Sequence, residues 1–547
     1  MEFRVRPALG AAAAAVLWMA GAAVPAPAAA AAELLVGTAG PTCVDPQYAT
    51  IQAAVTAAAP GATIRVCAGT YPETVEVDKP LTFLGAQAGV DARTGRTVPA
   101  EESIVDSSTG GFRIQGGVAN VTIDGFTIQN AGTPAQEDDG IEAFAGGSGY
   151  TFVDNIFTAN TYGINFHSDG TVATLIRHNR FFADNQTGSA GGAGVFVSNG
   201  PANDTTITEN SFSGHSSAAV NTTGSTADFS HDLLITDNTS TDDATFAVVV
   251  NARSTRVTGN VVTHTDPDDP NAGSAIFVGG NTDGLRIEGN VISGGAASGV
   301  RVTSFFGAPS TGLTITGNTI SSRRNGVRFG GGESDGTIDA NSVTGSSHDG
   351  ILVESGTSGL SVTHNTAGGS AVLDCEDDTT GSGTAGTANT WTDDIGATDQ
   401  PAGICEDAPA LTITKAHRGP FHRGQRGATY LLGVADAAGA GPTNGTAVTV
   451  TDRLPRGLKA TALAGPGWTC VLSTLTCTRA DVLAAGSAYP PLLLTADVSR
   501  HAPRHVVNAA SVTGGGDGAT HTALDPTLIN AKDAKKKCPR AGGDGCW

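Results

Sequence analysis

The sequence predicts an all-β protein: a long solenoid of stacked β-strand coils, followed by a smaller β-sandwich. A segment with alternating polar and apolar residues and one fixed Asn recurs between about residues 100 and 370. Aromatic residues make up only 5% and Met numbers two, so the core must be built from Val, Ile, Leu, Ala and Thr, which favours strands. After Cys405 the repeat stops, and short strands separated by Gly/Pro turns follow.

Residues 1–32 have the pattern of a secretory signal peptide. Arg4 and Arg6 precede an apolar run over 8–23, and small residues over 26–32 offer cleavage sites near Ala30 or Ala32. A membrane anchor is the less favoured alternative because this run is short. No later apolar run approaches the roughly 18 residues of a membrane span. We therefore expect a secreted, extracellular protein without a membrane span in its mature form; attachment to a cell surface stays open.

The charge balance argues against a nucleic-acid partner. Lys and Arg number 31 against 52 Asp and Glu, which gives a formal net charge of −21. Phosphate binding needs clustered basic residues.

The eight cysteines fall into pairs that are local in the sequence. In an exported chain this pattern predicts four disulfides. Zinc is the alternative, but no C-x-x-C and no His at ligand spacing accompany the cysteines. The expected pairs are Cys43/Cys67, Cys375/Cys405, Cys470/Cys477 and Cys538/Cys546.

The repeat has a variable length, which is typical of a solenoid whose turns tolerate insertions. Propeller blades need about 40 to 45 residues, and leucine-rich repeats need fixed Leu positions. Each coil is expected to hold two short strands, the first around the Asn and the second of the type GVRVT (299–303). If equivalent Asn side chains stack, they form an internal amide ladder that is scaffold and not an active site. The Asn positions are 155, 179, 210, 238, 260, 290, 318, 341 and 365.

These repeats resemble the right-handed parallel β-helix of the pectin lyase-like superfamily. The opening segments YATIQAAV (48–55), PGATI (60–64) and CAGTYPE (67–73) strengthen the resemblance. It implies a domain over residues 38–406 with about ten or more coils and an N-terminal helical cap. Thr50 would be the N-cap, and Ile51, Val55 and Ala58 would face the first coil. The fold hosts lyases, hydrolases, epimerases and non-catalytic adhesins, so it does not fix the function.

Residues 409–529 are expected to form an Ig-like β-sandwich. TDRLPRGL (451–458), the Cys470/Cys477 pair and NAASV (508–512) resemble the Ig-like repeat domain of bacterial surface proteins. Some relatives form a Lys–Asn isopeptide bond, and Lys415, Asn508 and Asp452 are the matching residue types. The alternative is that these are ordinary strand residues. Residues 530–547 form a short tail that holds Cys538 and Cys546 and lacks a sortase signal.

No catalytic motif of the superfamily is complete in this chain. Asp138-Asp139 is present, but Gly-His-Gly, Arg-x-Lys and Asp-Pro-His-Glu are absent. Glu142 and His167 are expected on the outward face of neighbouring coils, with Asp139 in an adjacent loop, where general acid/base chemistry is conceivable. A polar solenoid surface is the favoured alternative. No resident metal or cofactor is expected; the Asp pairs at 138/139, 242/243 and 268/269 leave calcium open.

One outward row of the second strands predicts a ligand-binding surface. It runs through Phe277, Arg301 and Arg328, and includes Val249 two coils before Arg301. Stacked guanidinium groups beside an aromatic ring suit an acidic glycan. Arg323 and Arg324 would add two cations from the preceding turn. The alternative is neutralisation of the arginines by Glu333, Asp335, Asp349 or Glu354 in weak surface ion pairs.

The sequence therefore predicts a secreted β-helix protein that binds an extracellular polysaccharide. The arginine row favours an acidic polymer. The alternative is a polysaccharide lyase or glycoside hydrolase. An activity screen on a panel of glycans would distinguish the two classes.

Overall fold

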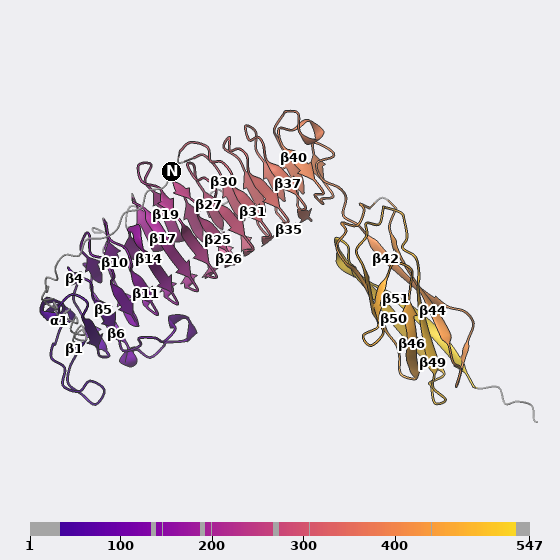
Figure 1. Cartoon of the computed structure of the whole chain (residues 1–547), viewed down its shortest axis with the longest axis horizontal. Helices are drawn as coiled ribbons and strands as arrows, with labels where there is room; N and C mark the ends of the chain where they lie inside the picture. Colours follow the sequence, from indigo (N-terminus) through magenta and orange to yellow (C-terminus); the bar gives the residue numbers. More distant parts are fainter. Residues whose placement is uncertain are drawn as a thin grey trace, which may run out of the picture.

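The computed structural model describes residues 33–531, except 133–137, 145, 186–191, 199, 266–272, 306 and 439. Within these residues the chain forms a solenoid up to about Glu406 and a separate β-sandwich from Leu411 onward (Figure 1). Both parts are almost entirely β, as the sequence predicts. In the described residues, no helix is long and apolar enough to cross a membrane.

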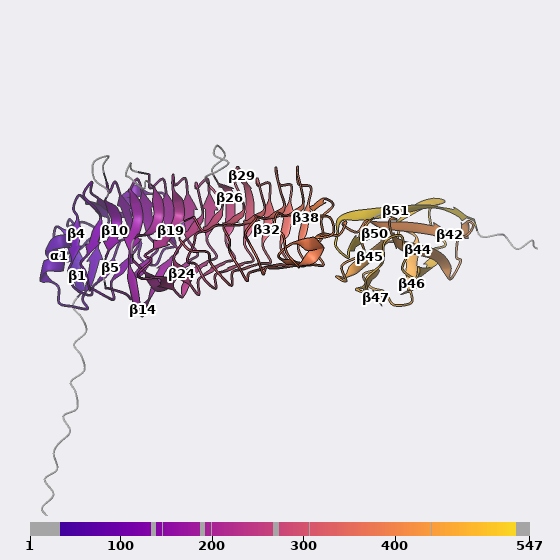
Figure 2. The same ribbon diagram turned by 90° about the horizontal axis from the view of Figure 1, so that it is seen from above.

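Three parallel sheets run the length of the solenoid, and successive coils add one strand to each (Figure 2). The 14-stranded sheet contains β1 Glu33–Val36, β2 Thr63–Val66, β5 Thr82–Leu84, β8 Thr122–Asp124, β11 Thr151–Val153, β14 Ser168–Arg177, β17 Ala202–Thr208, β21 Leu233–Thr236, β25 Arg256–Thr258, β28 Arg286–Glu288, β31 Thr314–Thr316, β34 Thr337–Asp339, β37 Ser361–Thr363 and β40 Thr390–Thr392.

The 12-stranded sheet contains β3 Gly69–Tyr71, β6 Ser103–Asp106, β9 Phe126–Gln129, β12 Ile156–Thr158, β15 Arg180–Phe182, β18 Ser211–Ser213, β22 Thr239–Thr241, β26 Val261–Thr265, β29 Val291–Gly295, β32 Thr319–Ser321, β35 Ser342–Thr344 and β38 Thr366–Gly368. The 13-stranded sheet contains β4 Val75–Val77, β7 Phe112–Ile114, β10 Asp139–Ala143, β13 Tyr162–Phe166, β16 Ala193–Ser198, β19 Ala218–Gly224, β23 Ala247–Val249, β27 Ile276–Val278, β30 Val300–Val302, β33 Val327–Phe329, β36 Ile351–Val353, β39 Cys375–Asp377 and β41 Asp399–Gln400. Short elements in the loops are η1 Ala92–Thr94, η2 Pro99–Glu101, η3 Thr384–Gly386, and the pair β20 Ser230–His231 and β24 Ala252–Arg253.

Each regular coil has three strands, not the two expected from the sequence. The segment around the repeated Asn is bent, so that it contributes one strand to the 14-stranded sheet and the next to the 12-stranded sheet. The residue before each Asn causes the bend, because its backbone is left-handed, with φ between 51° and 66°. These residues are Asp154, His178, Glu209, Asp237, Gly259, Gly289, Gly317, Ala340 and His364.

The predicted amide ladder is confirmed. The nine repeated Asn residues are buried, and each side-chain Nδ2 donates to the Oδ1 of the corresponding residue on the next coil at 2.8 to 3.2 Å. The ladder ends at Asp394, whose carboxylate takes the place of an amide. Around it lies one continuous apolar core of Val, Ile, Leu and Phe side chains. The Asn residues therefore satisfy the buried backbone at a bend.

A short helix covers the first coil, as expected. Helix α1 (Ile51–Ala57) begins at Thr50, whose hydroxyl accepts a hydrogen bond from the Ala53 N–H at 3.2 Å. Ile51 and Val55 are buried against the coil, and Ala58 is buried just after the helix. The solenoid begins earlier than the predicted residue 38, because β1 at Glu33–Val36 already pairs in parallel with β2.

Three of the four predicted disulfides are confirmed. Cys43–Cys67 joins the cap region to β2's end, Cys375–Cys405 closes the last coils, and Cys470–Cys477 joins neighbouring strands of the sandwich. Cys538 and Cys546, together with the predicted signal peptide, lie outside the described residues.

The C-terminal part has two sheets around an apolar core of its own. The four-stranded sheet has the order β42 Leu411–His417, β44 Ala428–Asp436, β49 Leu492–Val498 and β46 Leu458–Ala464. The six-stranded sheet has the order β43 Phe421–His422, β51 Asp517–Asn530, β50 His505–Gly514, β45 Val448–Arg453, β48 Thr476–Arg479 and β47 Thr469–Val471. Except for the short β43–β51 pair, these strands are antiparallel.

Candidate functional site

The outward row of the 13-stranded sheet brings together the predicted ligand-binding residues. Phe277 on β27 is directly paired with Arg301 on β30, and Arg301 with Arg328 on β33. One part of the predicted row is wrong: Val248, not Val249, is paired with Phe277 and points outward, whereas Val249 is buried. The strand begins one residue earlier than its repeats suggest, and a shift of one residue exchanges the two faces of a strand.

The two arginines have different environments. The Arg328 guanidinium donates twice to Glu354, at 2.6 and 2.9 Å, as the neutralisation alternative anticipated for this residue. Gly330 makes this pair possible, because a Cβ there would collide with the Glu354 carboxylate. Arg301 lies over the Phe277 ring at 5.8 Å. Burial and the positive charge of Arg328 lower the pKa of Arg301.

Arg323 does not belong to this surface, so its assignment as an added cation is wrong. Its side chain is buried and donates to the backbone carbonyls of Gly273 and Ser298 at 3.1 and 2.8 Å, and also to that of Gly294. Burial lowers its pKa to about 10. Arg323 therefore holds a turn between coils together, and only Arg324 stays partly exposed beside the row.

The row continues to an acidic group that the sequence analysis missed. Leu352 on β36 follows Arg328, and Glu376 on β39 follows Leu352. Burial and the negative charges of Asp349 and Asp378 raise the pKa of Glu376 to about 7. The carboxyl group is thus protonated in much of the population near neutral pH. The fixed outward position of the second strand could have identified Glu376. However, the segment CED (375–377) lacks the Gly or Ala, followed by Ile or Val, with which the other repeats begin.

An exposed aromatic ring lies close in sequence to Arg301. Phe305 follows β30 by three residues and is 75% exposed. A single exposed apolar side chain is common on protein surfaces, so Phe305 marks no site by itself.

Glu142 lies on the outward face of β10, as expected, but Asp139 is the first residue of that strand and not part of a loop. The Glu142 carboxylate accepts from Arg113 Nε at 2.9 Å, and Arg113 also binds Glu76 and Asp138. Asp139 is buried, and burial together with the charge of Glu142 raises its pKa well above the usual range. The His167 ring lies 5.3 Å from the Phe144 ring. Arg113 thus ties Glu142 into an ion-pair network.

The members of the Asp pairs have different surroundings in the described residues. Asp138 contacts Arg113, Asp243 is buried against His215, and Asp268 and Asp269 lie outside the described residues. One group in the described chain, Asp91, Asp154 and His178, has ligand atoms within 4.8 Å of one another. Arg93 already binds the Asp91 carboxylate at 2.7 Å, so a cation there would compete with a guanidinium.

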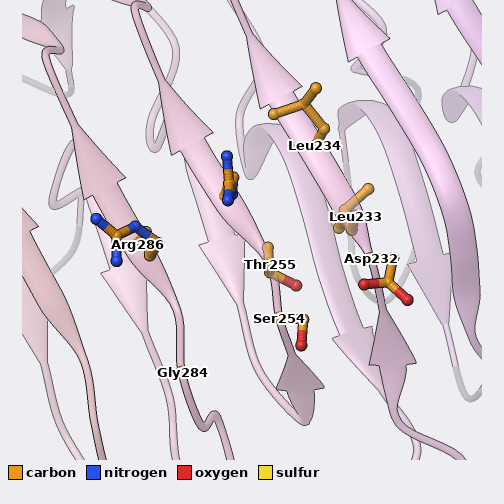
Figure 3. A pocket seen from close by; sticks show the side chains of 8 residues that line it. Asp232, Leu233, Leu234, Ser254, Thr255, Gly284 and Arg286 are labelled. Carbon is orange, nitrogen blue, oxygen red and sulfur yellow. The ribbon is translucent and has the colours of Figure 1, made fainter.

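A second stacked arginine pair lies on the 14-stranded sheet. Leu234 on β21, Arg256 on β25 and Arg286 on β28 occupy one register row. They line a shallow hollow of about 490 Å³ whose opposite rim includes Asp232 and Ser254 (Figure 3). The carboxylate of Glu288 accepts from Arg286 at 2.6 Å. This pair provides a comparison for Arg301 and Arg328 on a different sheet.

The sequence analysis also missed a buried charged cluster inside the solenoid. His215 lies between Asp243, at 2.6 Å from its Nδ1, and Asp184, at 3.4 Å from its Nε2. All three side chains are fully buried. Although burial alone would lower it, the two carboxylates raise the pKa of His215 to about 9. Asp184 also accepts from Asn160 Nδ2 at 2.8 Å, so the cluster acts as a short second ladder.

The three residues of the predicted isopeptide set lie on strands of the sandwich core. The Lys415 ammonium on β42 donates to Asp452 on β45, and the Lys415 Nζ lies 4.9 Å from the Tyr430 ring centre. Burial lowers the pKa of Lys415 and raises the pKa of Asp452. Asn508 on β50 is fully buried; neither of its side-chain polar atoms makes a well-aligned hydrogen bond, although its amide lies close enough to Asp452 to lower the pKa of that carboxyl group.

Comparison with known proteins supports the solenoid. The sequence matches the family described as "Right handed beta helix region" over residues 79–234 and 228–384, which together span more than half of the chain. No curated protein sequence matches the chain.

Among solved structures, the Dettilon tailspike protein aligns with a TM-score of 0.37 and 14% identity, covering 80% of this chain and 88% of that chain. A tailspike protein of E. coli bacteriophage HK620, in complex with a pentasaccharide, gives 0.37 and 14%, covering 81% and 89%. The Azotobacter vinelandii mannuronan C-5 epimerase AlgE6 A-module gives 0.34 and 14%, covering 63% and 88%. At these values the alignments do not bear on function.

Proposed function

Because this chain belongs to the right-handed β-helix family, we propose that its solenoid binds an extracellular acidic polysaccharide along the 13-stranded sheet. The observation that carries the proposal is the stacked row Phe277–Arg301–Arg328. Sugar rings pack on aromatic faces, and guanidinium forks bind carboxylate or sulfate groups. Phe305 would add an exposed apolar surface near the row.

The charge of the row supports an acidic ligand. Two arginines stacked on adjacent strands repel each other unless an anion lies between them. Glu354 compensates Arg328, and burial, followed by repulsion from Arg328, lowers the pKa of Arg301. A uronate or sulfate group at Arg301 would relieve that repulsion.

Calorimetric titration of acidic oligosaccharides at low salt tests this proposal. We expect the variant Arg301→Ala/Arg328→Ala to bind at least about tenfold more weakly than the wild type, which corresponds to the loss of one charged contact. Arg256→Ala/Arg286→Ala, on the other sheet, is the matched control and should bind like the wild type. Equal affinity of all three proteins, or no binding by any of them, would contradict the proposal.

A glycoside hydrolase or lyase is the second candidate function, and Glu376 is the observation that favours it. Its pKa of about 7 would let it donate a proton to a leaving group at neutral pH. In that case Glu376→Gln should abolish release of reducing ends or unsaturated products while leaving oligosaccharide binding intact. Release at the wild-type rate by this variant would exclude Glu376 as the acid.

The setting of this activity is also proposed. The disulfides are typical of an oxidising, extracytoplasmic compartment, which agrees with a secretory signal peptide over 1–32. The resemblances to the pectin lyase-like superfamily and to Ig-like domains of bacterial surface proteins fit a secreted bacterial protein. The sandwich would then present the solenoid at or near a cell surface.

A further inference from the structure

Basic residues gather at one end of the sandwich. Three connections meet there: residues 418–427 between β42 and β44, 454–457 between β45 and β46, and 499–504 between β49 and β50. Together with the strand ends beside them, they carry Arg418, Arg423, Arg426, Arg453, Arg456, Lys459, Arg500 and Arg504, and the three histidines His422, His501 and His505. Asp497 is the one acidic residue in the same segments. We call this set the basic end.

Backbone hydrogen bonds hold the three connections against one another. Ser499 N–H donates to the Gly457 carbonyl at 2.8 Å, and Gly424 N–H donates to the Val498 carbonyl at 3.0 Å. Arg423 Nε donates to the Ala502 carbonyl at 3.0 Å. The cations therefore lie on a connected framework, although the sequence separates them by up to about 85 residues.

The basic end lies away from the solenoid. β42 begins at Leu411, directly after the segment that links the sandwich to the solenoid, and reaches the basic end only at His417; the sandwich strands extend in this direction in Figure 1. The surface is thus separate from the arginine row on the 13-stranded sheet.

These cations form no ion pair with any other residue that the structure describes. In the described part of the sandwich the ion pairs are Lys415–Asp452, His417–Asp525, Arg479–Asp481 and His521–Asp517, and none includes a residue of the basic end. Asp497 instead accepts the Gly427 N–H at 3.1 Å. In a chain with a net charge of −21, this is a marked separation of charge.

The basic end also contains a cleft. It has a volume of about 600 Å³, and its walls include Arg456, Lys459, Ser499 and His501, together with the acidic Asp497. The cleft is large enough for one or two sugar residues by the usual range of ligand sites, about 300–1,000 Å³.

The chemistry of these residues favours an anionic polysaccharide. Seven of the eight fixed cations named above are arginines, whose forks bind carboxylate, sulfate or phosphate groups in two-point contacts. Among the described residues of the three connections, no large apolar side chain is exposed, whereas a membrane-docking surface inserts such side chains. Phe421, the one Phe, Tyr or Trp of the three connections, is buried, so only histidine rings are left to stack on a nucleic-acid base.

We infer that the basic end is a second binding site, which takes an anionic polysaccharide independently of the solenoid. Its ligand is a chain with closely spaced carboxylate, sulfate or phosphate groups. The inference does not rest on the function proposed for the solenoid row.

The test uses the full mature chain and three probes: dextran sulfate, polygalacturonate and neutral dextran. We expect Arg456→Glu/Arg500→Glu to lower affinity for at least one anionic probe about tenfold or more. Its binding should also depend less steeply on salt, because fewer charges are neutralised on binding. Arg256→Glu/Arg286→Glu on the solenoid carries the same change in net charge and should bind these probes like the wild type.

Several outcomes would overturn the inference. They are unchanged binding by the basic-end variant, an equal loss in the solenoid control, or binding to neutral dextran with the same affinity. Binding to phosphatidylglycerol vesicles, but to neither anionic probe, would assign the surface to membranes instead. Loss of binding in Arg301→Ala/Arg328→Ala alone would support the solenoid proposal and contradict this one. A far-ultraviolet spectrum and melting curve for each variant exclude misfolding.

Discussion

Buried polar side chains are the residue-scale feature that distinguishes this protein. Each Asn of the ladder has partners above and below, whereas Asn508 makes no well-aligned hydrogen bond in a fully buried position. A buried unsatisfied amide costs about 1–3 kcal/mol. Asn508 lies on a strand of the same core as the Lys415–Asp452 pair. A reaction of its amide with Lys415 would explain why the protein tolerates this cost.

We expect Lys415 and Asn508 to form an isopeptide bond. A neutral Lys415 Nζ would attack the Asn508 Cγ, the new amide would replace the side-chain amide, and ammonia would leave, with Asp452 relaying the proton. The burial-shifted pKa values of Lys415 and Asp452 both favour their neutral forms. Intact mass spectrometry should show the mature chain lighter than its sequence by one ammonia, and peptide mapping should find the cross-linked pair.

The variants Lys415→Ala, Asn508→Ala and Asp452→Ala should each have the full sequence mass. A wild-type protein with the full mass, after correction for disulfides and signal cleavage, would disprove the bond.

His215 should make the solenoid less stable at high pH. Its folded pKa of about 9 lies above its ordinary value of 6.5, so its stabilising effect is complete below about pH 6.5 and is lost as the pH rises through 9. The free energy of unfolding falls by at most about 3 kcal/mol over this range. Burial also raises the pKa of Asp184. This shift lowers the stability as the pH rises above the ordinary pKa of a carboxyl group, at lower pH than the effect of His215.

Melting curves between pH 6 and 10 check this prediction. His215→Asn should melt at a lower temperature than the wild type at pH 6, and its melting temperature should change less between pH 6.5 and 9. His501→Asn, at an exposed site in the sandwich, is the control and should follow the wild type. A wild-type solenoid with no fall in melting temperature over this range would be inconsistent with a charged, paired His215.

At the scale of the element, one dipeptide organises each coil. A left-handed residue turns the chain between two sheets, and the Asn that follows places its amide in the ladder. Asp, His and Glu occupy the left-handed position in several coils, although glycine has the lowest strain there. The stacking of identical bends thus outweighs the local preference of the residue.

We expect Asn260→Ala to destabilise the solenoid by about 2–4 kcal/mol. The substitution removes the donors to Asn290 and to the Ile235 carbonyl, and leaves the Asn238 side chain without its acceptor. Thermal melting measures the effect. Thr258→Ala, two residues earlier on β25 and facing outward, is the matched control and should change the melting temperature little. If both variants melt alike, the ladder is not a major source of stability.

At the scale of the whole molecule, the chain consists of two bodies with separate cores. The apolar clusters of the solenoid and the sandwich share no residue, and the chain passes from one to the other through residues 406–410. The basic end and the arginine row lie on different bodies. Such an arrangement allows one chain to contact two polymers, or two stretches of one polymer, at once.

Calorimetry should therefore show two unfolding transitions. Asn260→Ala should shift one of them, and Lys415→Ala, which removes one partner of a buried pair, should shift the other by a loss of several kcal/mol. A single transition that both variants shift equally would mean that the two bodies unfold together.

The sequence by itself determined the repeat, the parallel stacking, the amide ladder, the capping helix and the three disulfides of the described chain. The capping helix follows from the resemblance of the opening segments, and the others follow from patterns that recur along the coils or from cysteines close in sequence. The tertiary structure decided what depends on neighbours from other coils or loops. The sequence could not predict the one-residue register of β23, because residues 247–250 (AVVV) are all apolar and lack the alternation that distinguishes the two faces of a strand. It also could not predict that Arg323 turns inward, since a long side chain follows the space left by adjacent turns. Burial, together with the negative charge of Asp349 on the preceding coil, raises the pKa of Glu376, and the basic end exists only because three distant connections meet. The charge and burial of these residues depend on groups that folding brings together from different segments. No single segment of the sequence therefore predicts them.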